Sequence, residues 1–125
     1  MVRSVVSMIA AAVIIITGGI AEYYYLDKTF SDLTETFTAL QSDIEDKTCT
    51  SEQAISAQEK WLKEKEKLHI FIPHADIKEV DLWVSECVAY VTAKDYEEAA
   101  DKVYVALQLF KQIPKTFSLR IENLL

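Results

Sequence analysis

The chain has 125 residues, of which 20 are acidic and 13 are basic, so its formal net charge at pH 7 is −7. A chain this acidic, without a stripe of lysine and arginine alternating with aromatic residues, is unsuited to binding nucleic acid. Only two glycines and two prolines occur, a composition that favours long helices with short connections over a β-sandwich or a β-barrel.

An uncharged apolar run extends from Ser4 to Ala21, directly after a single basic residue, Arg3. At a rise of about 1.5 Å per residue, a run of this length can cross the hydrocarbon part of a bilayer as one helix. We therefore predict a transmembrane signal anchor over residues 1–21 and an extracytoplasmic domain over residues 22–125. Arg3 favours a cytoplasmic N-terminus, which makes this a single-pass protein of the cytoplasmic membrane.

The same run has a second interpretation as a cleaved signal peptide. It contains an apolar core from Ile9 to Ile16 and a small-x-small cleavage site at Gly19-Ile20-Ala21. Cleavage after Ala21 would release a secreted helical domain. The apolar run is longer than the core of an ordinary signal peptide, so we favour retention of the anchor and keep the secreted domain as the alternative.

Beyond the apolar run, large hydrophobic residues recur at alternating spacings of four and three. They are Leu26, Phe30, Leu33, Phe37, Leu40 and Ile44, which we call the seam residues. This heptad-type pattern predicts one amphipathic helix that continues from the apolar run to about Asp46. The six side chains must pack on other helices of the chain or on a second copy, so homo-oligomerisation stays open.

A second helix is predicted to start at Thr50, because Thr50 and Gln53 fit a capping box. The run from Lys63 to Lys67 alternates in charge and is typical of a solvated face. The helix is expected to end near residues 69–72, since Pro73 disfavours a helical conformation in the residue before it. Its predicted inward residues are Ala54, Ile55, Trp61, Leu62 and Leu68.

Asp76 with Glu79 and Asp95 with Glu98 resemble helix-capping pairs and predict the starts of a third and a fourth helix. The apolar face of the third helix is predicted to carry Ile77, Val80, Val84, Cys87, Val88 and Val91. That of the fourth is predicted to carry Tyr96, Ala99, Ala100, Val103, Ala106, Leu107 and Phe110. Pro114 is expected to stop or kink the fourth helix, before a short helical tail with Phe117, Ile121, Leu124 and Leu125.

These elements together predict an all-α fold. In it, an N-terminal transmembrane helix continues into an antiparallel four-helix bundle, which ends in a short C-terminal helical tail. The predicted connections are short, so helices that follow each other in sequence are expected to be neighbours in space.

Four short motifs resemble the C-terminal part of an uncharacterised bacterial family. They are His69-Ile70-Phe71-Ile72-Pro73-His74, Asp81-Leu82-Trp83, Lys94-Asp95-Tyr96 and Ile113-Pro114-Lys115. Members of that family are short proteins with an N-terminal membrane segment, typical of spore-forming anaerobes. The resemblance implies a membrane-anchored helical domain of unknown function that works with a small integral membrane protein, and it implies no catalytic residues.

His69, His74 and Asp76 are the only clustered residues of a metal-binding type. Their spacing places a turn between the ligands instead of one helical face, and the sequence has no HExxH motif. Both imidazoles are equally suited to hydrogen bonding with the backbone at the Pro73 turn. The three residues are therefore weak metal candidates, and we expect no metal and no other cofactor.

Cys49 and Cys87 leave a disulfide open, because the domain is predicted to lie outside the cytoplasm. Helix geometry places Cys87 roughly 10 Å along its helix from the turn that holds Cys49, which disfavours the bond. Cys87 also falls on an apolar face, where a thiol behaves as a small hydrophobic side chain. The sequence offers no neighbouring base that would activate either sulfur.

The carboxylates of the predicted bundle give no sign of an enzyme. The acidic residues of the third and fourth helices are expected to face water, and no Glu-x-x-His pair of a di-iron bundle occurs. These residues are Glu79, Asp81, Glu86, Glu97 and Glu98. We therefore expect a non-enzymatic protein.

The leading hypothesis is an accessory or interaction module that binds a membrane or envelope protein at the outer face of the cytoplasmic membrane. Tyr23, Tyr24 and Tyr25 follow the apolar run, where aromatic rings favour the headgroup layer. Together with Phe71 and Trp83 they are the candidate contact residues. A ligand-sensing bundle that signals through a partner is the alternative.

Overall fold

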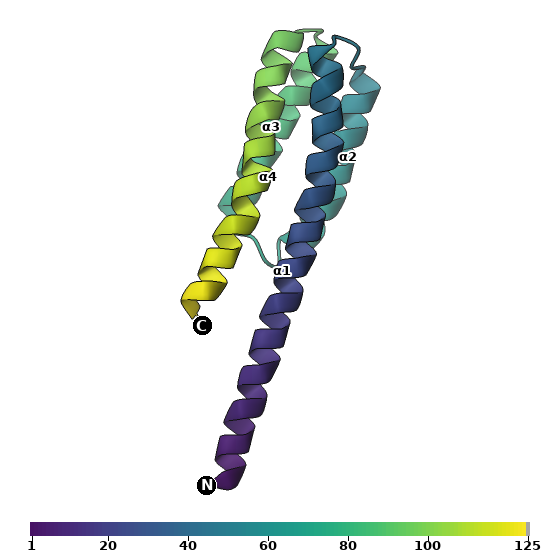
Figure 1. Ribbon diagram of the computed structural model, residues 1–125. Coiled ribbons are helices and arrows are strands. Elements are labelled where there is room, and N and C mark those ends of the chain that lie inside the picture. The colour runs from purple at the N-terminus through teal and green to yellow at the C-terminus, as the bar shows by residue number, and fades with distance from the viewer. Residues whose placement is uncertain (125) are drawn as a thin grey trace.

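The computed structural model describes residues 1–124, and in that part of the chain it contains four α-helices and no strand. Figure 1 shows these helices as an antiparallel bundle from which one end of the first helix projects. The predicted all-α fold is therefore confirmed. The helices are α1 (Val2–Glu45), α2 (Ser51–Leu68), α3 (His74–Thr92) and α4 (Tyr96–Leu124).

Helix α1 is unbroken over 44 residues and has two different parts. Residues 2–21, which we call the stem, carry no buried side chain. From Leu26 onward, all six seam residues are buried in the bundle. The predicted continuity between the apolar run and the first bundle helix is thus confirmed.

The core of the bundle is formed by the four helices of one chain. Each helix packs against the next one in the chain, and α4 returns to pack against α1. Phe110 of α4 lies at the centre, with its ring centroid 6.0 Å from that of Phe30, 5.2 Å from Phe37 and 5.9 Å from Trp61. The seam residues are therefore covered by helices of the same chain.

Two of the predicted helix starts are confirmed by their hydrogen bonds. The backbone N–H of Gln53 donates to the Thr50 hydroxyl (3.2 Å), and the backbone N–H of Thr50 donates to the Gln53 side-chain oxygen (2.9 Å). At the start of α4, the backbone N–H of Glu98 donates to the Asp95 carboxylate (3.2 Å). These bonds satisfy amide groups that have no partner within the helix.

The capping prediction for α3 is wrong. The helix begins at His74, directly after Pro73, and no side chain caps it. Pro73 has a φ of −55° and a ψ of 142°, a geometry suited to the residue before a helix, so α3 starts three residues earlier than the Asp76–Glu79 pair indicates. Asp76 lies in the first turn instead, where its charge complements the positive end of the helix dipole.

The prediction that Ile55 and Leu62 of α2 point into the core is also wrong. Ile55 and Leu62 are 42% and 43% exposed. Each directly follows a buried residue, Ala54 and Trp61 respectively, and is therefore rotated about 100° around the helix away from the core. Ala57 was not among the predicted inward residues, but it is buried, as are Ala54 and Trp61.

Pro114 does not end α4, which continues as one helix to Leu124. A proline inside a helix removes one backbone hydrogen bond, but here the neighbouring Phe110 and Ile113 are buried and Phe117 packs against the core. The predicted C-terminal tail is helical and is continuous with α4. Leu125 lies outside the described residues, as do the side chains of Ile121 and Leu124.

A polar contact between α2 and α3 holds the largest buried side chain in place. The indole N–H of Trp61 donates to one oxygen of Asp81 (2.7 Å), and the Lys65 ammonium donates to the other (2.6 Å). Trp61 is fully buried, whereas the charged pair is about one-quarter exposed. Asp81 was predicted to face water, and that prediction is wrong because Trp61 requires an acceptor at this depth.

Replacing Asp81 by alanine is expected to lower the free energy of unfolding by about 1–3 kcal/mol, because the Trp61 N–H would stay buried without an acceptor. The measurement is urea unfolding of the purified full chain in mild detergent. Asp81→Asn keeps an acceptor oxygen and is the matched control, which should lose less stability. Equal losses in the two variants would contradict the role given to the Trp61 bond.

Candidate interaction surface

The bundle has two ends of different character. The tip, residues 43–52 and 94–101, contains the α1–α2 and α3–α4 connections, which are joined by a bond from the Tyr96 hydroxyl to the Cys49 carbonyl (3.2 Å). The base is the opposite end, from which the stem projects (Figure 1). It contains the start of the buried part of α1, the α2–α3 connection and the end of α4, and we define it as residues 22–28, 67–76 and 111–122.

Four of the five predicted contact aromatics lie at the base. The Tyr25 ring packs against Phe71, with centroids 5.8 Å apart, while Phe71 itself is half-buried against the core. Tyr23 is half-buried and meets the edge of Tyr24 at 6.0 Å. Tyr24 is 67% exposed. The structure thus brings the tyrosines and Phe71 together, and leaves Tyr24 as the aromatic side chain most open to a partner among them.

Trp83 lies elsewhere, on the side of the bundle where α3 meets α4. Its ring is half-buried against the core, and the Lys102 ammonium lies 5.3 Å from the ring centroid, as well as 5.7 Å from that of Tyr90. Lys102 also pairs with Glu86 at 3.6 Å. The Trp83 N–H is buried and has no hydrogen-bond partner among the described residues. Trp83 is therefore covered mainly by its own chain.

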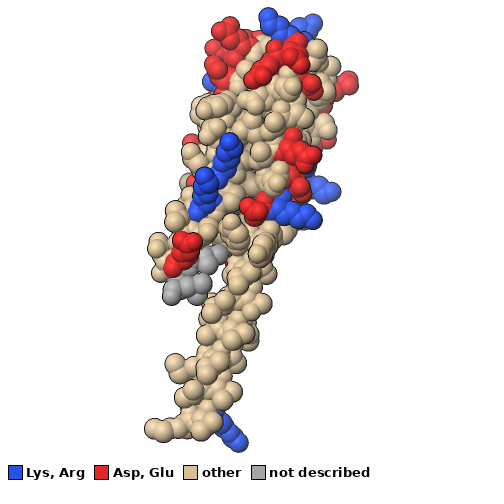
Figure 2. Space-filling model, viewed as in Figure 1, with Lys and Arg blue, Asp and Glu red and all other residues tan. Residues whose placement is uncertain are grey.

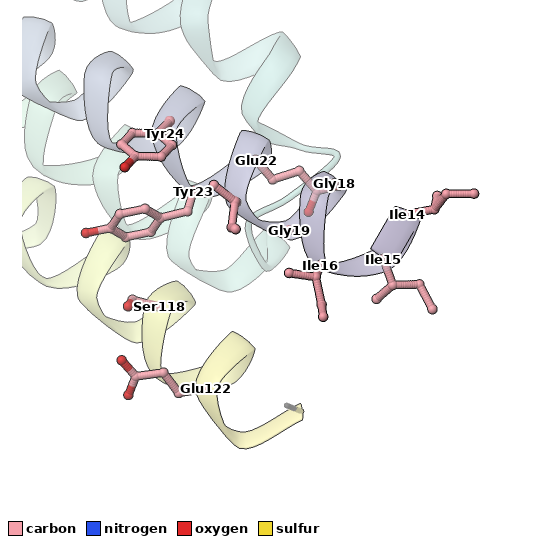
Figure 3. Close-up of a pocket in the computed structure, with 11 residues that line it drawn as sticks. Ile14, Ile15, Ile16, Gly18, Gly19, Glu22, Tyr23, Tyr24, Ser118 and Glu122 are labelled. Carbon is pink, nitrogen blue, oxygen red and sulfur yellow. The ribbon is translucent and has the colours of Figure 1, made fainter. Parts of the chain in front are cut away.

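A groove of about 620 Å³ runs between the stem and the end of α4 (Figure 3). The stem contributes an apolar wall, formed by residues 14–16 and 18–20. Ser118 and Glu122 of α4 and Glu22 of α1 add polar groups to the same groove. The end of α4 therefore lies beside the stem, an arrangement that the expected stop or kink at Pro114 does not predict.

One comparison with known proteins decides the family. A family model described as a domain of unknown function, DUF4363, matches residues 20–124. The chain belongs to this family. The DUF4363 match covers the bundle and the stem from Ile20 onward, while most of the apolar run precedes it. No curated protein and no solved structure matches the chain.

Membership of the DUF4363 family confirms the resemblance to an uncharacterised family. The bacterial source and the membrane anchor implied by that resemblance stay predictions. Among the described residues, α1 is the one helix that is long and apolar enough to cross a membrane, and none of its apolar stretch is buried. A signal sequence near the N-terminus has the same properties.

The predicted metal residues lie at the base of the DUF4363 domain. The rings of His69 and His74 stack with centroids 5.7 Å apart and an interplanar angle of 29°. Both side chains are exposed. No group of three or more histidine, cysteine, aspartate or glutamate residues within residues 1–124 is arranged to hold a metal ion. The two histidines and Asp76 accordingly do not form such a group.

Both cysteines of the DUF4363 domain are buried and occur as free thiols. Burial, and secondarily the Asp43 carboxylate, raises the pKa of Cys49. Burial, and secondarily Cys49, raises the pKa of Cys87 from an ordinary value of 9.0 to about 12. Neither sulfur has the lowered pKa of a nucleophilic or redox-active cysteine.

Alkylation of Cys87 at pH 8 is expected to be about 1,000-fold slower in the folded protein than in the unfolded chain, since a pKa of about 12 instead of 9.0 reduces the thiolate fraction by that factor. The unfolded chain loses this proton first, so folding stability should fall as the pH rises from about 9 to about 12. Mass spectrometry after maleimide labelling, with and without urea, measures the rate. Rapid labelling of Cys87 in the native protein would contradict the raised pKa of this thiol.

Proposed function

We propose that the protein is a non-enzymatic accessory module held in the cytoplasmic membrane by its stem, with the N-terminus inside and the bundle outside. The observation that carries this proposal is the abrupt change along α1. The apolar side chains of residues 4–21 are exposed, whereas the seam residues that follow in the same helix are buried. An exposed apolar surface of this length is stable in a bilayer and unfavourable in water.

The continuity of α1 supports a fixed orientation for the anchored bundle. No loop separates the stem from the first buried turn at Leu26, so the direction of the stem sets the direction of the bundle. With the stem in the membrane, the base faces the lipid surface and the tip points away from it. Arg3 at the other end of the stem favours the cytoplasmic side.

We also propose that the outward part of the bundle binds a membrane or envelope protein. Ile55 and Leu62 support this, because they are seven residues apart on one face of α2 and are both exposed. Leu82 of α3 and Tyr104 of α4 add further exposed hydrophobic groups at the sides of the bundle. The resemblance to an anchored bacterial family that works with a small integral membrane protein favours the same class of partner.

Single cysteines at exposed positions test the topology. In intact cells, a membrane-impermeant maleimide should label Glu52→Cys at the tip and should reach Val2→Cys only after the cells are permeabilised. The unsubstituted protein is the background control, since both of its own cysteines are buried. Labelling of Val2→Cys but not Glu52→Cys in intact cells would contradict the proposed orientation.

Site-specific photo-crosslinking tests the partner. A photoreactive residue at Leu62 should give one discrete protein adduct in intact membranes, and the same residue at the neighbouring exposed Lys63 is the matched control. Lys63 is rotated about 100° around α2 and belongs to the charged face. If Leu62 gives no adduct, or if both positions give the same spread of products, the proposed binding face is wrong.

A further inference from the structure

Exposed hydrophobic side chains gather at the base from three separate segments. Ile70 of the α2–α3 connection is 79% exposed, Tyr24 of α1 is 67% exposed and Leu119 of α4 is 59% exposed. Outside the stem, they are the three most exposed large hydrophobic residues in the described part of the chain. None of them fills the core, so all three are available to a surface outside the bundle.

The two ends of the bundle also differ sharply in charge. The tip carries eight acidic and two basic residues, a formal charge of −6. The base carries four acidic and five basic residues, a formal charge of +1 with its histidines neutral. Figure 2 shows a cluster of acidic residues at the end farthest from the stem, with further acidic residues along the side of the bundle, and a stem without visible charge except for a basic residue at its far end. That basic residue is Arg3, the only charged residue of the stem. An anionic lipid surface would repel the tip and tolerate or attract the base.

The end of α4 lies at the level where the stem changes from apolar to polar. Ser118 and Glu122 share a groove with Ile14–Ile20 and with Glu22 and Tyr23 (Figure 3). The segment from Glu22 to Tyr25 spans about 6 Å at 1.5 Å per residue, close to the thickness of one headgroup layer. With Ser4–Ala21 in the hydrocarbon, the part of α4 around Ser118, which lines the groove together with Tyr23, is therefore placed in that layer. The last turn of α4, at Glu122, reaches the apolar residues at the outer end of the stem.

Resting on the proposed anchoring, we propose that the base is itself a lipid-binding surface. Tyr24, Ile70 and Leu119 enter the outer boundary between headgroups and acyl chains, and Lys67, Lys115 and Arg120 are positioned at the base to meet lipid phosphates. The occupant of this apolar surface is thus the bilayer and not a protein. The bundle contacts the membrane at three points around the stem, which prevents it from tilting freely on its anchor.

A polarity-sensitive fluorophore on single cysteines tests this placement in the full-length protein. We would label Ile70→Cys and Leu119→Cys, because both side chains are exposed and their replacement leaves the core intact. Val13→Cys reports on the stem, and Glu52→Cys reports on the tip. The proteins are reconstituted in vesicles of phosphatidylethanolamine and phosphatidylglycerol, with and without lipids that carry a nitroxide either near the top of the acyl chain, to reach the boundary, or near its end, to reach Val13.

At Ile70 and Leu119, the expected result is a blue-shifted emission that the nitroxide lipids quench, as at Val13. At Glu52, the emission should be that of the fluorophore in water, without quenching. Quenching at Val13 but not at Ile70 or Leu119 would overturn the lipid-binding base and leave the anchor intact. Absence of quenching at Val13 would instead overturn the proposed function. A blue shift at Ile70 without quenching would mean that a second copy covers the base, which also overturns the inference.

Discussion

Replacing Leu33 by aspartate is expected to unfold the bundle. Leu33 lies in the middle of the seam and is completely buried between α1 and the other helices. Placing a carboxylate there removes the packing of the leucine and buries a charge without a partner, a combination that costs more than about 4 kcal/mol. A domain of this size has a total stability of only about 5–15 kcal/mol. Circular dichroism and urea unfolding of the full chain in detergent would measure the loss.

Leu82→Asp is the matched control, because Leu82 is a leucine of α3 that is 53% exposed. Its free energy of unfolding should change by no more than about 0.5 kcal/mol. A Leu33→Asp protein that stays folded but loses a partner copy in light scattering would contradict our description. That outcome would mean that the seam forms an interface between chains instead of the core of one chain.

Placing two arginines in the stem is expected to remove the protein from the membrane. Val13 and Ile14 lie near the middle of the apolar run, and both are exposed on the stem. An arginine at the centre of a membrane helix costs about 2.5–3.5 kcal/mol on insertion scales, so Val13→Arg with Ile14→Arg costs about 5–7 kcal/mol. Immunoblotting of alkali-washed membranes would show loss of the protein from the membrane fraction.

The corresponding double leucine variant, Val13→Leu with Ile14→Leu, keeps the stem apolar and should remain in the washed membranes. The arginines are distant from the buried seam, so the bundle of the displaced protein should retain its helical circular dichroism. Continued membrane retention of the double arginine variant would contradict the assignment of the stem as the anchor, and would point to attachment through the bundle.

Hydrophobic periodicity was sufficient to predict the bundle part of α1, and a capping motif was sufficient to predict the start of α2. The seam from Leu26 to Ile44 is buried at every predicted position, and the Thr50–Gln53 capping box is present. Both predictions depend on residues that are close in sequence. The spacing of apolar residues and the identity of the capping residues can therefore be read from the sequence itself. The inward face of α2 was less predictable, because the hydrophobic residues Ile55 and Leu62 directly follow the buried residues Ala54 and Trp61 in the sequence but are themselves exposed.

The base could not be predicted, since it depends on contacts between distant segments. Pro114 indicated a stop or a kink in α4, but α4 is continuous through the buried neighbours Phe110 and Ile113, and its end lies beside the stem. In the same way, Asp81 looked like a solvent-facing carboxylate until the fold placed the Trp61 N–H beside it. Phe71 and Trp83, predicted contact residues, are partly covered by the core for the same reason.

The most direct test of the central claim is the mass of the mature protein in its membrane. Mass spectrometry of the protein extracted from alkali-washed native membranes would distinguish retention of the stem from cleavage within it. Our account predicts a chain that still contains residues 1–21 and is found only in the membrane fraction. A soluble chain that begins at Glu22, outside the cytoplasm, would contradict the anchor and would establish a secreted helical domain instead.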